Sequence, residues 1–149
     1  MAYLLDTNVL VRLANTSDAL HPIALRAVVE MDRRGELLHV TSQPLIEFRS
    51  VATRPATMNG LGMAPLDVEI EAAAYESVFP LLAETPDIYP AWKALVSSLG
   101  VIGKQVHDAR LVAVCHVHGV THLLRFNTAH FARLSTSGPG IVVVDPATV

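Results

Sequence analysis

The stretch that decides the fold is Tyr3-Leu4-Leu5-Asp6-Thr7-Asn8-Val9-Leu10, near the start of the chain. Its first three residues form an apolar run, and polar residues then interrupt the pattern before Val9, Leu10 and Leu13 resume it at helical spacing. This pattern predicts a buried strand that turns sharply into a helix. In open α/β sheets, ligands bind at the carboxyl ends of the strands. Asp6 is therefore a candidate site residue, although an aspartate in this place also serves as a helix cap.

The same order of strand and helix continues along the chain. Apolar or β-branched runs between turn residues predict further strands at 37–41, 120–124 and 141–144. Apolar stripes and end signals predict helices that begin at His21 and Ser42, helices over 66–78, 90–99 and 104–118, a loop over 58–65, and two helical turns within 127–134. Strands that are continuously apolar and alternate with helices indicate a parallel sheet covered on both faces.

Length and composition favour one folded domain over residues 1–149. The chain is 51% hydrophobic and 17% charged, which excludes a disordered protein. It holds no apolar run of transmembrane length and starts without the features of a signal peptide, so we expect a cytoplasmic protein without a membrane partner. The single cysteine, Cys115, excludes an internal disulfide and is interpreted as a core residue.

The charge balance alone does not identify a partner. The net charge of −3 lacks the positive excess that is typical of nucleic-acid binding, but a few gathered carboxylates can bind cations that reverse the local field. Nine of the eleven basic residues are arginines, whose planar guanidinium suits phosphate oxygens and surface ion pairs alike.

Three acidic residues lie at positions where the hydrophobic pattern of the strands and helices predicts apolar residues. Besides Asp6, Glu47 lies among apolar residues in the first turn of a helix, where it could also offset the helix dipole. Asp108 shares a helical stripe with Leu111, Val112 and Cys115. A carboxylate on a core face is costly without a partner, and no basic residue falls on that stripe. Three carboxylates that meet at the carboxyl edge of the sheet would repel one another, so the residues predict a hard divalent cation, Mg²⁺ or Mn²⁺.

These residues, together with His107-Asp108-Ala109 and the segment from Leu123 to Phe131, resemble a PIN-domain ribonuclease of the VapC toxin type over the whole chain. The resemblance implies a three-layer α/β/α fold with a central, mostly parallel sheet. It also implies Mg²⁺-dependent RNA cleavage, inhibition by a cognate antitoxin, and a homodimer. Asp6, Glu47 and Asp108 match the metal-binding acids of the family, and Asn127 matches its fourth catalytic position. Asn8 matches the residue that supports the first acid, with Thr7 beside it.

Two positions depart from the family pattern. Arg125 stands where a small hydroxyl residue usually ends the strand, and His130 stands where an acid usually precedes the aromatic residue. Because Asn127 and His130 are both uncharged, the site holds three formal negative charges instead of four or five, which leaves the second metal position open. His130 is either an exposed residue without a role or a ligand that shifts the preference from Mg²⁺ toward Mn²⁺.

Four basic residues are candidates for holding RNA phosphates: Arg49, Lys104, Arg110 and Arg125, with Arg49 and Arg125 expected near the rim of the site. Two other functions stay open. One is a degenerate PIN domain that binds RNA or an antitoxin without cutting, which Arg125 and His130 favour. The other is a phosphotransfer domain, but the phosphatase kind needs a second aspartate at the position of Asn8.

Overall fold

A computed structural model describes all residues of the chain, 1–149. The elements follow one another as β1 (Ala2–Leu5), α1 (Thr7–Ala14), α2 (His21–Arg33), β2 (Leu37–His39), α3 (Ser42–Thr53), η1 (Ala56–Met58), α4 (Pro65–Val78), α5 (Ile88–Leu99), α6 (Gln105–His118), β3 (His122–Leu124), α7 (Ala132–Ser135), β4 (Val142–Val144) and η2 (Pro146–Thr148). Local chemistry explains several of these boundaries. Pro65 opens α4 at a position that needs no backbone donor, and Gly119, with φ +66°, ends α6 in the left-handed conformation.

The four strands form one parallel sheet in the order β2-β1-β3-β4. Because helices pack on both faces of the sheet, the side chains of Tyr3, Leu4 and Leu5 in β1 are buried. Tyr3 and Leu5 pack into one hydrophobic core, and Leu4 packs into the other. The two cores account for the continuous apolar run that opens the sequence.

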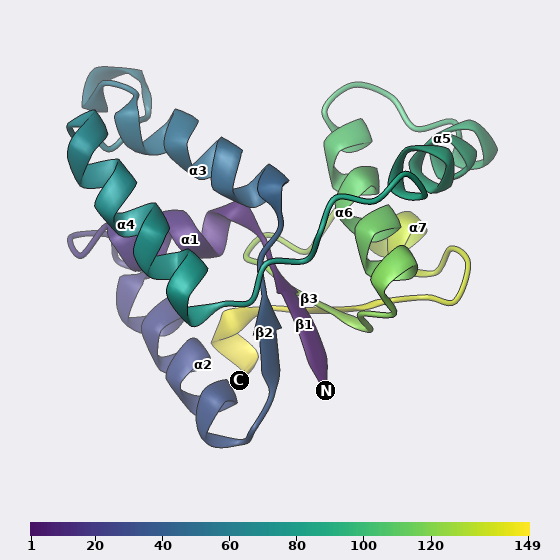
Figure 1. Cartoon of the computed structure of the whole chain (residues 1–149), viewed down its shortest axis with the longest axis horizontal. Coiled ribbons are helices and arrows are strands. Elements are labelled where there is room, and N and C mark those ends of the chain that lie inside the picture. Colours follow the sequence, from purple (N-terminus) through teal and green to yellow (C-terminus); the bar gives the residue numbers. More distant parts are fainter.

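Helices cover both faces of the sheet, as Figure 1 shows. The first core joins one face to α1, α2, α3 and α4, and the second joins the other face to α5, α6 and α7. The predicted three-layer α/β/α fold with a parallel sheet is confirmed. None of the helices combines the length and the apolar character needed to cross a membrane.

The structure differs from the sequence prediction mainly at the ends of elements. The second strand stops at His39, because Val40 pairs instead with Leu81 in an isolated bridge. Where two helical turns are predicted within 127–134, only the single turn of α7 forms, and it begins at Ala132. Asn127, the first residue of the predicted segment, adopts φ +60°, which is incompatible with a helix. The carboxyl ends of β1 and β3 lead into the space between α3 and α6, where the predicted acidic residues meet (Figure 1).

Candidate functional site

The structure brings Asp6, Glu47 and Asp108 to one hollow of about 330 Å³. Asp6 follows β1 and caps α1, with its Oδ1 accepting a hydrogen bond of 2.7 Å from the Thr7 backbone N–H. Glu47 comes from the middle of α3 and not from the predicted first turn, because the helix already begins at Ser42. Asp108 comes from the first turn of α6. Three elements that are distant in the sequence thus supply the three carboxylates.

Two neighbouring side chains hold Glu47 in place. The Thr7 hydroxyl donates to Glu47 Oε2 at 2.7 Å, and the Gln43 amide donates to Glu47 Oε1 at 3.0 Å. The same amide donates to the backbone carbonyl of His107 at 3.0 Å, which ties α3 to α6 next to Asp108. Sequence analysis missed Gln43. The signal that could have found it is an amide one helical turn before an acidic residue on the same face.

Arg125 lies inside the site, which corrects the expectation that it stands on the rim. Its Nη1 is 3.3 Å from Asp6 Oδ2 and 3.2 Å from Asp108 Oδ1, and its guanidinium carbon lies 4.1 Å from the centre of the Phe131 ring. The residue is buried, at 9% exposure. The parallel register explains this placement, since Leu124 pairs with Leu5 and the residues that follow these two positions are Arg125 and Asp6. The basic partner that the helix stripe of Asp108 lacked comes from β3 instead.

One guanidinium does not fully balance the three carboxylates. Burial raises the pKa of Asp6 to about 6 in spite of the opposing effects of Arg125 and of the Thr7 backbone N–H, and the charges of Asp108 and Glu47 raise it further. An all-oxygen donor set with excess negative charge fits a hard divalent cation. In this arrangement no three acidic, histidine or cysteine side chains close around a common point, and the Arg125 guanidinium contacts both Asp6 and Asp108. The donor chemistry therefore fits a cation, with Arg125 competing for two of the ligands.

Asn8 acts on the backbone that follows β3 rather than on Asp6. Its amide donates to the Phe126 carbonyl at 2.8 Å, and its Oδ1 accepts from the Phe126 N–H at 3.0 Å. This pair of hydrogen bonds joins α1 to the end of β3 and so helps to set the position of Arg125.

The structure does not bring Asn127 or His130 to the three acids. Asn127 is exposed at its left-handed turn and does not line the acidic hollow. His130 is also exposed and lines a separate hollow of about 240 Å³ with Leu99 and Arg133. In this arrangement neither side chain is placed as a ligand beside Asp6, Glu47 and Asp108.

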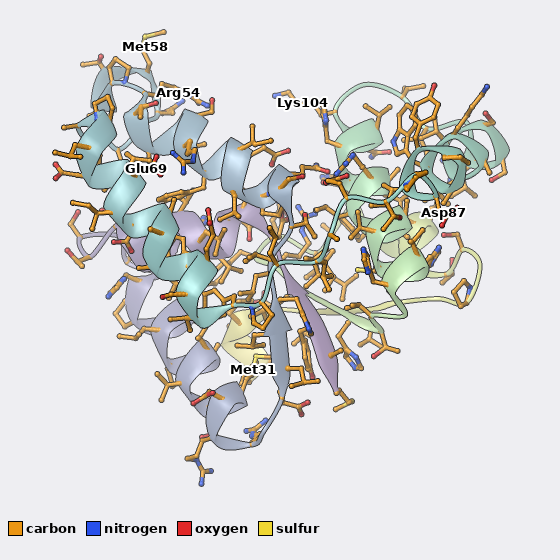
Figure 2. The ribbon with its side chains drawn as sticks, in the orientation of Figure 1. Met31, Arg54, Met58, Glu69, Asp87 and Lys104 are labelled. Carbon is orange, nitrogen blue, oxygen red and sulfur yellow. The ribbon has the colours of Figure 1, made fainter.

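Basic residues surround the opening of the site unevenly. Lys104 and Arg54 line a second hollow of about 490 Å³, which shares Thr7, Glu47 and Asp108 with the first. Figure 2 shows the two residues at the ends of α6 and α3, on opposite sides of the space between these helices. Arg54 was not predicted from the sequence, because nothing in the sequence distinguishes it from an ordinary polar residue at the end of a helix.

Three other arginines have defined partners. Arg12, also missed, lines the acidic hollow and lies over the Phe126 ring at 4.8 Å. Arg110 binds Glu84 at 2.6 Å and Gln43 at 3.3 Å, so it is one side chain away from Glu47. Arg49 pairs with Glu69 of α4 and lines neither hollow of the acidic site, so the structure does not bring it to the rim.

Comparison with known proteins agrees with this arrangement. The PIN domain family model matches residues 3–136. In overall structure the chain is similar to VapBC2 from Rickettsia felis, solved with a DNA fragment of its promoter, at a TM-score of 0.67 and 15% identity over 97% of this chain and 98% of that one. It is similar to the toxin VapC20 from Mycobacterium tuberculosis, described as cleaving the sarcin-ricin loop. The TM-score is 0.64 and the sequence identity 21%, over 85% of this chain and 91% of that one. It is also similar to a toxin-antitoxin complex from Klebsiella pneumoniae, with a TM-score of 0.64 and 22% sequence identity over 97% of both chains. No curated protein matches the sequence.

Proposed function

Because the chain belongs to the PIN domain family, we propose that it is a metal-dependent ribonuclease of the VapC type, the toxin of a toxin–antitoxin pair. The observation that carries this proposal is the meeting of Asp6, Glu47 and Asp108 at the carboxyl edge of a parallel sheet, beside a hollow with basic walls. The reaction is the hydrolysis of an RNA phosphodiester bond.

The three carboxylates would hold the cation, which we propose to be Mg²⁺, with Mn²⁺ as the alternative. A bound divalent cation supplies a polarised phosphate oxygen and a water molecule that loses its proton near neutral pH. The protein's own task is positioning. Thr7 and Gln43 fix the two oxygens of Glu47, so that this carboxylate does not need to reorganise.

Phosphate binding is assigned to the basic side chains at the opening. Lys104 and Arg54 line the same hollow as Glu47 and Asp108, so a strand that lies across the acids passes between them. Arg110 is held more rigidly, by Glu84 and Gln43, and its planar guanidinium is suited to a second phosphate. Arg125 is assigned to the acids instead of to RNA, because Asp6 and Asp108 already engage it.

The proposed partners are an RNA substrate, a cognate antitoxin and a second copy of the chain. An antitoxin is supported by the similar structures, several of which are complexes of a toxin with its antitoxin. The RNA substrate follows from the site chemistry, and the homodimer follows from the family resemblance.

Cleavage of total RNA by the purified protein tests the nuclease function directly. We expect fragments with Mg²⁺ or Mn²⁺, none with EDTA, and almost none from Asp108→Asn in either metal. Asp67→Asn, which removes an exposed carboxylate from α4, is the matched control and should cut like the wild type. Equal cutting by the wild type and Asp108→Asn would show that the acids are not the catalytic centre.

A second candidate is a PIN domain that binds RNA or an antitoxin without cutting. The guanidinium of Arg125 between Asp6 and Asp108 favours it, because two of the three metal ligands already have a cationic partner. No cleavage in either metal, together with RNA binding retained in a separate titration, would identify this function.

A further inference from the structure

A further hollow, of about 360 Å³, adjoins the acidic site on the side of α5 and α6. Aromatic side chains form part of its wall: Tyr89 and Trp92 lie in the first turns of α5, with ring centres 5.6 Å apart and ring planes 30° apart. Tyr89 is 64% exposed, whereas every other tyrosine and phenylalanine of the chain is buried. An exposed aromatic ring beside a hollow is a feature that the fold itself does not require.

The hollow is built from side chains that are held in place. The Trp92 indole donates to the Val106 carbonyl at 2.7 Å, which fixes the plane of its ring. Arg110 lines the hollow with its guanidinium fixed by Glu84 and Gln43. Glu84 is the one acidic residue of the lining, and its carboxylate is engaged by Arg110.

The hollow also adjoins the acidic site. His107 lines both this hollow and the one that contains Glu47, Asp108 and Lys104. From Arg110, hydrogen bonds run through Gln43 to Glu47. A nucleotide strand that lies over the acids can therefore place its neighbouring residue at this hollow.

We propose that this hollow, lined by Tyr89, Trp92, His107 and Arg110, is a subsite that receives one unpaired nucleobase of the RNA next to the bond that is cut. Single-stranded bases are recognised by stacking on aromatic rings and guanidinium planes, and such stacking tolerates any base. The inference rests on the proposed ribonuclease function and adds a preference for single-stranded RNA at one position beside the cut.

Trp92 provides a direct readout, because it is the only tryptophan of the chain. A short single-stranded RNA and the same backbone without bases are titrated against the protein in EDTA, which prevents cleavage. Binding is followed by Trp92 fluorescence and, separately, by the anisotropy of a label on the RNA. We expect the intact RNA to quench Trp92 and the abasic strand to leave its fluorescence unchanged.

Substitution of the exposed ring tests the stacking step. Tyr89→Ala should weaken binding of the intact RNA about five- to tenfold and leave the abasic strand unaffected. Tyr89→Phe should bind like the wild type because it retains the ring. Ile70→Ala, at a residue of α4 that is 63% exposed, is the matched control for the loss of surface apolar area.

The outcomes separate this subsite from the proposed function. If the wild type and Tyr89→Ala bind intact RNA equally, or if the abasic strand also quenches Trp92, the subsite is overturned while RNA binding by the protein stands. If no RNA binds to any variant in EDTA, the subsite is overturned, and cleavage of total RNA with Mg²⁺ or Mn²⁺ decides the ribonuclease function separately.

Discussion

At the scale of single residues, the most consequential side chain is Arg125. Its guanidinium is a buried positive charge that contacts Asp6 and Asp108 and so reduces the repulsion between these two carboxylates. This position gives Arg125 two opposite effects. It partly neutralises the two carboxylates that it contacts, and it would compete with the proposed metal for Asp6 and Asp108.

Substitution of Arg125 by the hydroxyl residue of the family pattern separates these effects. In EDTA, Arg125→Thr should lower the free energy of unfolding by about 2–4 kcal/mol, because Asp6 and Asp108 lose their buried partner. Addition of Mn²⁺ should then raise the unfolding temperature of the variant more than that of the wild type, since a ligand stabilises the state that binds it. Unfolding curves in EDTA and in Mn²⁺ provide the measurement.

The matched control is Arg49→Thr, which removes an arginine whose ion pair with Glu69 is exposed to solvent. It should change stability little in either condition. An equal Mn²⁺ response in the wild type and Arg125→Thr would contradict the competition between guanidinium and metal.

Gln43 is the other residue whose role is visible only in the folded chain. Its amide fixes Glu47 and contacts the backbone of α6, so Gln43→Leu should leave the fold intact and weaken Mn²⁺ binding about 10- to 100-fold. Calorimetric titration with Mn²⁺ measures this change. Gln105→Leu, at the exposed start of α6, serves as the control. Unchanged metal affinity in Gln43→Leu would show that Glu47 needs no support.

At the scale of elements, the site depends on the junction between α1 and the end of β3. Asn8 makes both of its hydrogen bonds to the backbone of Phe126, the residue next to Arg125. Asn8→Ala should destabilise the protein by about 1–3 kcal/mol, because it leaves the Phe126 N–H without a partner and removes one of the two donors to the Phe126 carbonyl, the other being Arg125 Nε. The amide of Phe126 should then exchange its hydrogen faster, as mass spectrometry can show.

Asn15→Ala is a suitable comparison for this junction. The side chain of Asn15, at the other end of α1, contacts only the exposed hydroxyl of Ser17. It should affect neither stability nor exchange at Phe126. If the two variants behave alike, the junction is held by packing and not by Asn8.

The elements also show how far sequence analysis reaches. Asp6, Glu47 and Asp108 could be predicted because each breaks a hydrophobic pattern, and parallel strands direct their carboxyl ends to one edge. The place of Arg125 could not be predicted, since it depends on the register of β3 against β1. Asn127 was expected in the site from the family pattern, but its positive φ turns the chain away from the acids.

At the scale of the whole molecule, the site lies where the two helical layers meet. Figure 1 shows α3 and α4 on one side of the sheet and α5 and α6 on the other. The helix α3 provides Glu47, and α5 and α6 provide Asp108 and the hollow lined by Tyr89 and Trp92. The sheet and several side-chain contacts join these parts: Gln43 of α3 donates to the His107 carbonyl of α6, and Arg125 contacts both Asp6 and Asp108. The integrity of the site therefore depends on the stability of both cores.

Cys115 reports on the second core. The side chain is fully buried between α6 and the sheet, and burial raises the pKa of its thiol to about 12. Because the thiolate is the reactive form, the native thiol should resist alkylation at pH 8, where an unperturbed cysteine reacts. We expect the labelling rate to rise only with denaturant, in parallel with global unfolding measured by circular dichroism. The fully denatured chain is the control and should react at once. Rapid, complete labelling in native buffer would instead show that the layer of α5 and α6 opens by itself, in which case the acidic site is assembled only part of the time.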